Sequence, residues 1–315
     1  MKRVFGVCLA VLFLMGAAAS VYAADNLVLA TGGTAGTYYP FGGAMAKIWN
    51  SKVKDMNVTA QTTGASAENV RLINKKEVEL ALVQSDTLDF AFNAKEAFKE
   101  PLKGMSTIAV LYPEIIQVVV GAASPIKSIA DLKGKKVGVG APGSGTEANF
   151  RQLLDAYGMK KEDVNAQFLS FSESAEAYKD KHIDAFIVTA GIPNAGIMDV
   201  ATQNEIRILD VPADIIAKLT QKYPFLAGAK VPANTYKGQT AEVSTVAVTA
   251  VLIAGSQLKE DMVYNLTKAL FENQADLAAA HAKGKELNIQ TAAKGVSIPF
   301  HPGAVKYYKE KGVMK

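Results

Sequence analysis

The chain is almost free of cysteine, and Cys8 is the single example among its 315 residues. Beyond Cys8 the sequence can form no disulfide, and it offers neither a thiolate nucleophile nor a Cys-ligated metal site. Its folded state must therefore depend on a hydrophobic core. The length suffices for this, because a chain of about 290 residues suits two lobes of ordinary domain size.

Long apolar runs are also missing. The first run, Val4–Met15, follows two basic residues and is well short of the roughly 20 residues of a membrane-spanning helix. Small residues then lead to Ala23 in an A-x-A-like sequence. This order is typical of a secretory signal peptide, so we expect residues 1–23 to be removed near Ala23 and the protein to be periplasmic. A retained N-terminal anchor is the alternative.

A strong charge of either sign is absent too. The formal net charge is +4, and it is +2 once Lys2 and Arg3 leave with the signal. This balance argues against binding to nucleic acid. Enzyme motifs are likewise missing: the glycine-rich turns match neither a dinucleotide fingerprint nor a P-loop, and the three histidines lack metal-binding spacing. The sequence therefore predicts no catalysis, no cofactor and no metal.

Strand and helix signals alternate along the rest of the chain, as in α/β proteins with parallel sheets. Leu27–Ala30, Val58–Ala60 and Leu80–Val83 have the composition of buried strands, each followed by a helical pattern. A second unit repeats this plan about 110 residues later, with Lys136–Gly140 and Ile183–Val188 as two of its strands. We therefore predict two similar lobes, each an open, mainly parallel sheet flanked by helices, with a ligand cleft between them.

Two strand-like segments, 108–120 and 243–253, are long enough to cross between the lobes. If both cross, lobe 1 comprises residues 24–112 and 247–315, and lobe 2 comprises residues 113–246. The C-terminal helices then return to lobe 1. Such a chain path lets the two lobes close over a ligand about the two crossovers.

Two glycine-rich turns, 31–39 and 140–147, each follow the first strand of a unit and open a helix. Glycine lets the backbone approach a ligand closely, and a helix N-terminus presents free N–H groups and a partial positive charge. Open α/β sheets bind ligands at such strand-end turns. The two turns therefore predict a site for a small anion. The alternative is that the second turn has only a structural role, because Ser144 and Glu147 have the spacing of a capping box, in which the serine hydrogen-bonds to the amides of its own helix.

Polar residues end the third strand of each unit, beside these turns. Residues 84–86 and 189–194 offer neutral donors and acceptors that can orient a ligand. Asp86 is better suited to capping the following helix than to meeting an anion. Arg71 and Arg151 can clamp a carboxylate, although pairing at the surface is the stronger expectation.

Taken together, these segments resemble the TAXI family of solute receptors for tripartite ATP-independent periplasmic (TRAP) transporters. The resemblance covers nearly the whole chain after residue 23, in segments of matching order and spacing: 31–40, 68–72, 82–86, 143–147, 191–193, 232–236, 301–304 and 307–308. It implies a two-lobed periplasmic-binding-protein fold, type II-like, and delivery of the ligand to TRAP membrane subunits driven by an ion gradient. Family members are associated with glutamate, glutamine, 2-oxoacids or dicarboxylates such as 2-oxoglutarate. We also expect a monomer.

By this resemblance, the residues that face the ligand are Gly33, Thr34, Tyr38, Gln84, Ser85, Ser144, Gly145, Thr146, Thr189 and Ala190. No arginine is among them, so amide and hydroxyl groups must hold the anion. Two other functions stay open. A binding protein of the same kind can serve a two-component sensor or an ATP-driven importer, and a secreted enzyme on a two-lobed scaffold is the weaker alternative.

Overall fold

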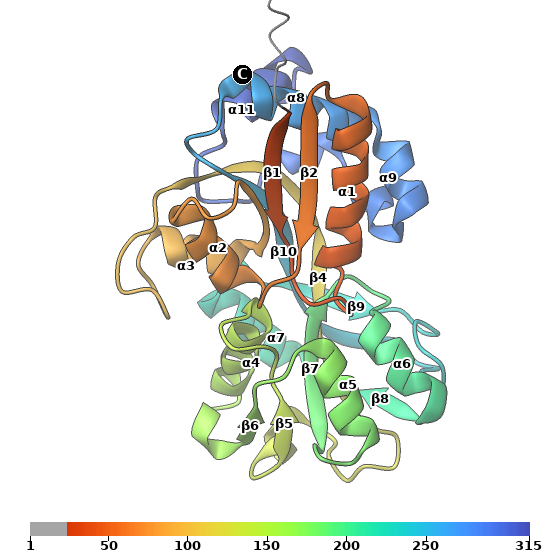
Figure 1. The fold of residues 1–315 in the computed structure, drawn as a ribbon. Coiled ribbons are helices and arrows are strands. Elements are labelled where there is room, and N and C mark those ends of the chain that lie inside the picture. Colours follow the sequence, from red (N-terminus) through yellow and green to blue (C-terminus); the bar gives the residue numbers. More distant parts are fainter. Residues whose placement is uncertain (1–23) are drawn as a thin grey trace, which may run out of the picture.

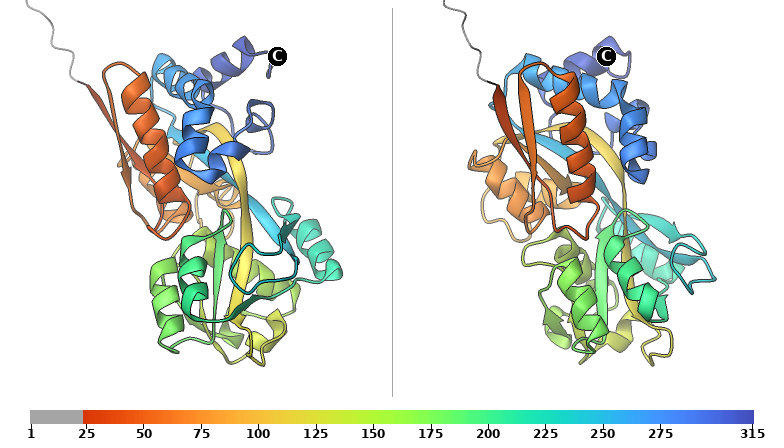
Figure 2. Two further views of the ribbon diagram at one scale, coloured as in Figure 1. Left: turned by 90° about the vertical axis from the view of Figure 1, so that its right-hand side faces the viewer. Right: turned by 45° about the vertical axis from the view of Figure 1, so that its right-hand side comes forward.

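The computed structural model describes residues 24–315, so the predicted signal peptide lies outside the described residues. The described chain forms two halves joined by two long strands (Figure 1, Figure 2). Its strands are β1 (Asp25–Ala30), β2 (Met56–Gln61), β3 (Leu80–Gln84), β4 (Met105–Gly121), β5 (Lys136–Gly138), β6 (Asn165–Gln167), β7 (Ala185–Ala190), β8 (Ile206–Ile208), β9 (Ala227–Val231) and β10 (Val243–Gly255).

Helices flank this sheet in both halves. The α-helices are α1 (Tyr38–Lys52), α2 (Ser66–Asn74), α3 (Ser85–Phe92), α4 (Gly145–Ala156), α5 (Phe171–Lys179), α6 (Ala195–Gln203), α7 (Ala213–Lys222), α8 (Glu260–Glu272), α9 (Gln274–Ala280), α10 (Ile289–Ala292) and α11 (Pro302–Glu310). Short 3-10 helices are η1 (Ile129–Leu132), η2 (Lys161–Asp163) and η3 (Ala282–Glu286). Among residues 24–315 no helix combines the length and the apolar character needed to cross a membrane.

One sheet runs through both halves in the order β2-β1-β3-β10-β4-β7-β5-β6, with β8 beside β4 and β9 beside β10. β1 pairs in parallel with β2 and β3, and β5 pairs in parallel with β6 and β7. The long strands β4 and β10 are antiparallel to each other and to their neighbours in the sheet. The predicted fold class is therefore confirmed, because each half contains a parallel unit and the crossovers join them.

The two crossovers are continuous strands. β4 runs without a break through Pro113. The partner strand β10 shifts register opposite this proline, and such an irregularity accommodates a residue that cannot donate a ladder hydrogen bond. The predicted lobe boundaries, at 112/113 and 246/247, fall inside these two strands and stay a prediction.

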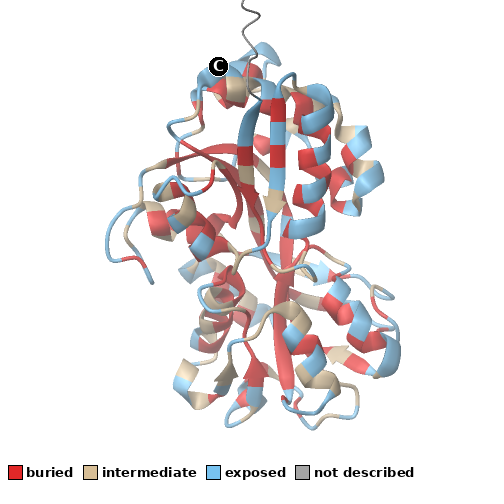
Figure 3. Cartoon of the chain, in the orientation of Figure 1, coloured by how far each residue is buried: buried red, intermediate tan, exposed pale blue. Residues whose placement is uncertain are grey.

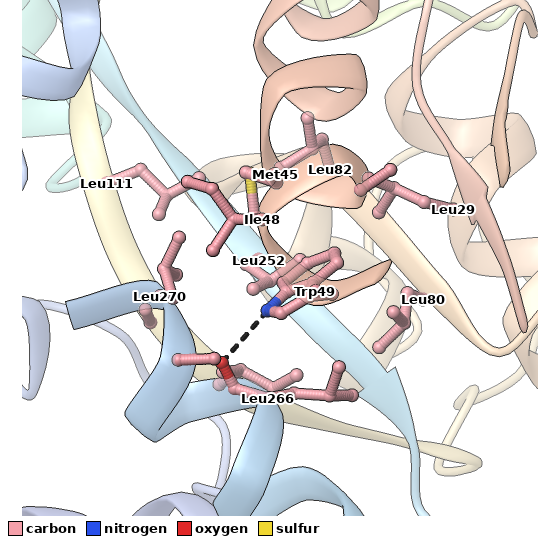
Figure 4. Packing of buried hydrophobic residues seen from close by; sticks show 14 of the residues in the cluster. Leu29, Met45, Ile48, Trp49, Leu80, Leu82, Leu111, Leu252, Leu266 and Leu270 are labelled. Atoms are coloured by element: carbon pink, nitrogen blue, oxygen red, sulfur yellow. Dashed lines mark hydrogen bonds between the residues drawn. The ribbon is translucent and has the colours of Figure 1, made fainter. Parts of the chain in front are cut away.

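Helix α1 shows how the local sequence builds the core of the N-terminal half. Phe41, Met45, Ile48 and Trp49 recur at the spacing of one helix face, and all four are buried. The indole N–H of Trp49 donates to the carbonyl of Leu266 on α8 at 2.9 Å (Figure 4). Helix α8, from the C-terminal part of the chain, therefore packs against α1 of the N-terminal half.

The other half has its own hydrophobic clusters. Phe150 and Leu153 on α4 pack with Val137 on β5 and Ile187 on β7. Buried residues follow the sheet and the inner faces of the helices in both halves (Figure 3). Because each half has a core of its own, the halves can separate without exposing either core, which hinge motion requires.

Candidate ligand-binding site

A cavity of about 70 Å³ lies between the two halves, beside the carboxyl ends of β1, β2, β3 and β7. The two glycine-rich turns face each other across it. Whether the lining residues contact a ligand stays a prediction. Eight of the ten predicted residues line the cavity: Gly33, Tyr38, Gln84, Ser144, Gly145, Thr146, Thr189 and Ala190.

Two predicted residues are not part of the cavity wall. Thr34 is exposed in the first glycine-rich turn, and Ser85 is buried as the first residue of α3. Residues of both predicted turns line the cavity, but the sequence pattern does not specify which of several successive turn residues points inward. The orientation of each side chain is decided by the backbone path of the turn.

Other lining residues were not predicted as ligand-facing. They include Thr63, Gly64 and Ala65 after β2, and Ser170 and Phe171 after β6. Both segments follow the second strand of a unit. Ligands bind at strand-end turns in such sheets. Applying this rule to the second strands, as well as to the first and third, predicts these lining residues.

Four helices begin at the cavity. The lining includes the first residue of each, namely Tyr38 of α1, Ser66 of α2, Gly145 of α4 and Phe171 of α5. The first amide groups of a helix have no partner within that helix, and the helix dipole adds a partial positive charge there. Four N-termini from both halves therefore make the cavity attractive to negative charge without an arginine.

The capping alternative for the second turn is partly right. Ser144 Oγ accepts a hydrogen bond from the Glu147 amide at 3.2 Å, so this serine caps α4 while it lines the cavity. The Glu147 carboxylate lies 3.1 Å from Arg151 Nε. The guanidinium of Arg71 lies 4.8 Å from the ring centre of Phe98. Neither arginine is a lining residue, which agrees with the stronger expectation of pairing elsewhere.

Two polar side chains in the cavity wall lack partners. Gln84 Oε1 and Thr189 Oγ1 are buried, and neither forms a hydrogen bond with any residue between 24 and 315. A buried polar atom without a partner costs about 1–3 kcal/mol. A ligand that hydrogen-bonds to these atoms removes that cost, so unpartnered polar groups in a cavity wall are typical of a binding site.

Glu114 was not predicted from the sequence. Its side chain lines the cavity from β4, is buried, and accepts a hydrogen bond from the Tyr38 hydroxyl at 2.7 Å. Burial raises the pKa of Glu114 to about 8, against the Tyr38 hydrogen bond, which lowers it. The signal available in the sequence was an acidic residue inside the apolar segment 108–120.

Two of the three histidines, His281 and His301, have structural roles in the described chain. His281 accepts a hydrogen bond from the Lys283 amide at the start of η3, and His301 accepts one from the Gly303 amide at the start of α11. Burial lowers the pKa of both imidazoles. Between residues 24 and 315 no group of three His, Cys, Asp or Glu side chains is arranged to hold a metal ion.

Residues 29–312 match a family described as NMT1-like, and this match spans nearly all of the described chain. The chain belongs to the NMT1-like family. The resemblance to TAXI receptors is more specific than this assignment. For this NMT1-like protein, membership of the TAXI group and partnership with TRAP subunits stay predictions.

Curated relatives match part of the NMT1-like chain. Proteins of Brucella abortus (strain 2308) and Brucella suis biovar 1 (strain 1330), both provisionally named binding proteins, are 30% identical to it over 117 residues. The match covers 37% of this chain and 36% of each relative. The matched segment thus spans about a third of the relatives' length.

Solved structures share the fold at low sequence identity. A protein of Bordetella bronchiseptica RB50 has a TM-score of 0.56 at 17% identity, over 92% of this chain and 89% of that chain. SsuA, the alkanesulfonate-binding protein of Xanthomonas axonopodis pv. citri bound to MOPS, has a TM-score of 0.52 at 14% identity, over 91% and 90%. A structure described with glutathione import via GshT and the cystine ABC importer TcyBC of Streptococcus mutans has a TM-score of 0.53 at 15% identity, over 84% and 98%. These likenesses show the two-lobed binding-protein fold alone.

The two halves of this NMT1-like protein are closed around the cavity. Asn149 and Gln152 on α4 donate hydrogen bonds to Asp86 Oδ2 on α3, at 2.9 and 3.3 Å. Asn194, before α6, donates to the carbonyl of Ala35 at 3.0 Å. Asp86 lies in the first turn of α3 and also accepts a hydrogen bond from the Thr87 amide, but no side-chain capping bond is present at the start of α3, so the predicted capping bond is absent. Burial raises the pKa of Asp86. Because these contacts join separate cores, they form only in the closed state.

Proposed function

We propose that this protein is a periplasmic solute receptor that encloses a small anionic metabolite between its two halves and passes it to a membrane importer. The main support for this proposal is that four helices begin at one cavity. The wall of this cavity also contains the unpartnered polar groups of Gln84 and Thr189. The provisional naming of the Brucella relatives as binding proteins supports the same role. The proposed role is binding without chemical change of the ligand.

We place the negative group of the ligand at the start of α4, next to the first amides of Gly145 and Thr146, with Gly33 and Tyr38 covering it from the other half. The volume limits the ligand. A cavity of about 70 Å³ is roughly half of the 150 Å³ cavity that takes up benzene, so compact anions fit this closed state. To bind a five-carbon dicarboxylate such as 2-oxoglutarate, the two halves must close less tightly, which leaves a larger cavity between them.

Different observations favour two different classes of membrane partner. The resemblance of the glycine-rich and strand-end segments to TAXI receptors favours TRAP subunits, driven by an ion gradient. The solved proteins named for ABC importers share the fold, which makes an ATP-driven importer the other candidate. Uptake into proteoliposomes that contain the candidate subunits separates the two, because ionophores abolish only gradient-driven uptake and removal of ATP abolishes only ATP-driven uptake.

The ligand class is tested by a thermal-shift screen of the protein without residues 1–23. The panel contains acids of increasing size, from pyruvate through succinate to 2-oxoglutarate and glutamate, together with alkanesulfonates and uncharged analogues. A ligand at a hundred times its Kd adds about 2.7 kcal/mol of stability, which raises the Tm by several degrees. We expect shifts with anions only, and the ligand recovered unchanged by mass spectrometry. Shifts confined to uncharged compounds, or a ligand chemically converted, contradict the proposal.

A further inference from the structure

Glu114 is the one acidic residue among the described residues that line the cavity. Its position conflicts with the rest of the wall, because four helix N-termini attract negative charge and a carboxylate at Glu114 repels it. The conflict disappears if the Glu114 carboxyl group is neutral in the closed state. A neutral carboxylic acid is also a hydrogen-bond donor, which an ionised carboxylate is not.

The hydrogen bond from Tyr38 fixes where the proton of such an acid lies. The Tyr38 hydroxyl donates to Oε2 of Glu114 at 2.7 Å, so Oε2 is the accepting oxygen. The other oxygen, Oε1, has no hydrogen-bond partner between residues 24 and 315, and the side chain borders the cavity. The proton therefore belongs on Oε1, where it is available to an acceptor atom inside the cavity.

The surroundings of Glu114 favour the neutral form. Three groups shift the pKa of Glu114, namely Tyr38 of α1, Asp86 of α3 and Lys283 of η3. The negative charges of Glu114 and Glu286 act in turn on Tyr112 of β4. Lys283 forms an ion pair with Glu286 at 2.6 Å, and Glu114 forms no ion pair within the described chain.

These groups oppose one another in their effect on the carboxyl group. Loss of hydration on burial is the largest influence and raises the pKa of Glu114 to about 8, with a further increase from the negative charge of Asp86. The Tyr38 hydrogen bond and the charge of Lys283 lower this pKa, but by less. Burial also raises the pKa of both tyrosines, so the two phenols stay neutral in the range in which Glu114 titrates.

We propose that Glu114 is a specificity-determining residue that binds the ligand as a protonated carboxylic acid, donating a hydrogen bond from Oε1 to an anionic oxygen of the ligand. This inference rests on the proposed function as an anion receptor. It excludes the opposite role, in which an ionised Glu114 pairs with a ligand ammonium group. Alkaline solution removes the proton, so the receptor loses its donor and gains a repelling charge at the same time.

The expected size of the effect follows from the fraction of protonated Glu114. With half-titration near pH 8 in the closed state, about 90% of the closed receptor carries the proton at pH 7 and about 10% at pH 9. Since the apparent Kd varies inversely with the competent fraction, it rises about tenfold between pH 7 and pH 9. The affinity is fully present below this range and is lost as the pH rises through it.

The test is isothermal titration calorimetry at pH 7, 8 and 9 with pyruvate, succinate and 2-oxoglutarate, whose carboxylates stay ionised throughout. In Glu114→Gln the amide keeps a neutral donor of the same shape but cannot ionise, so we expect the Kd of this variant to change less than twofold between pH 7 and pH 9, where the wild-type Kd rises about tenfold. In Tyr38→Phe the hydrogen bond that lowers the pKa is gone, so the loss of affinity shifts to higher pH.

The outcomes separate this inference from the proposed function. A wild-type Kd that does not change between pH 7 and pH 9 overturns the inference while leaving the anion receptor intact. Binding that strengthens with pH, or that Glu114→Gln abolishes at pH 7, also overturns it, because an ionised Glu114 is then the binding form. If no anion of the thermal-shift panel binds at pH 7, the proposed anion receptor itself fails.

Discussion

Substitution of Gly145 by alanine tests the placement of the ligand cleft most directly. Gly145 is the first residue of α4, and a Cβ atom built on it overlaps the carboxamide group of Gln84, from the end of β3 in the other half. The Cγ of Gln84 lies 3.1 Å from that Cβ position. The overlap exists only when the two halves are closed, so Gly145→Ala opposes closure without disturbing either core.

The expected loss follows from the cost of overpacking. An added methyl group in a packed site costs about 1–3 kcal/mol, which corresponds to a 5- to 150-fold rise in Kd at about 1.4 kcal/mol per factor of ten. Gln84 can move aside, but it then leaves the cavity and its contact with the ligand is lost. The fold is unaffected, because alanine is favoured over glycine in a helix by up to about 1 kcal/mol.

The assay is calorimetric titration with the strongest anion from the screen, combined with the Tm of the unliganded protein. Gly43→Ala is the matched control, since Gly43 lies on the exposed face of α1 with no atom near its Cβ position. We expect the control to keep the wild-type Kd. Adding Gln84→Ala to Gly145→Ala removes the overlapping group, so the loss from the double variant must be less than the sum of the two single losses.

An unchanged Kd for Gly145→Ala would refute the reasoning, because the overlap with Gln84 would then be absent from the state that binds the ligand. A Tm that falls by many degrees also contradicts it. Such a fall places the clash inside one half, in the unliganded fold, and not between the two halves. Small-angle scattering with saturating ligand gives an independent check, since the variant must remain more extended than the wild type.

Two further substitutions separate closure from folding. Asn149→Ala removes the 2.9 Å hydrogen bond to Asp86 across the cleft, so we expect the Kd to rise about 10- to 100-fold while the unliganded Tm stays close to wild type. An unchanged Kd argues against a role of this bond in closure. Trp49→Ala leaves a cavity in the core and removes the hydrogen bond to the Leu266 carbonyl, so we expect chemical denaturation to show a free energy of unfolding about 3–5 kcal/mol lower. A loss below about 1 kcal/mol contradicts the packing described.

The sequence alone determined the elements whose signals are local. The spacing of Phe41, Met45 and Trp49 specifies one buried face of α1 because a helix repeats every 3.6 residues. The second glycine-rich turn specifies a strand-to-helix junction, since Gly140 and Gly143 adopt positive φ angles that other residues avoid. Even the crossing strands β4 and β10 follow from runs of apolar residues longer than one half requires. The alternation of these elements was sufficient for the fold class.

The tertiary structure alone decided which polar groups meet. Tyr38 and Glu114 are 76 positions apart, and Asp86 and Asn149 are 63 apart, yet each pair shares a hydrogen bond. Such pairs depend on the order of the strands in the sheet and on how far the halves close, and neither quantity is encoded by residue spacing. Burial follows from the same arrangement. The carboxyl group of Glu114 stands in an apolar strand in the sequence, but only the surrounding helices and strands remove its water and change its preferred charge.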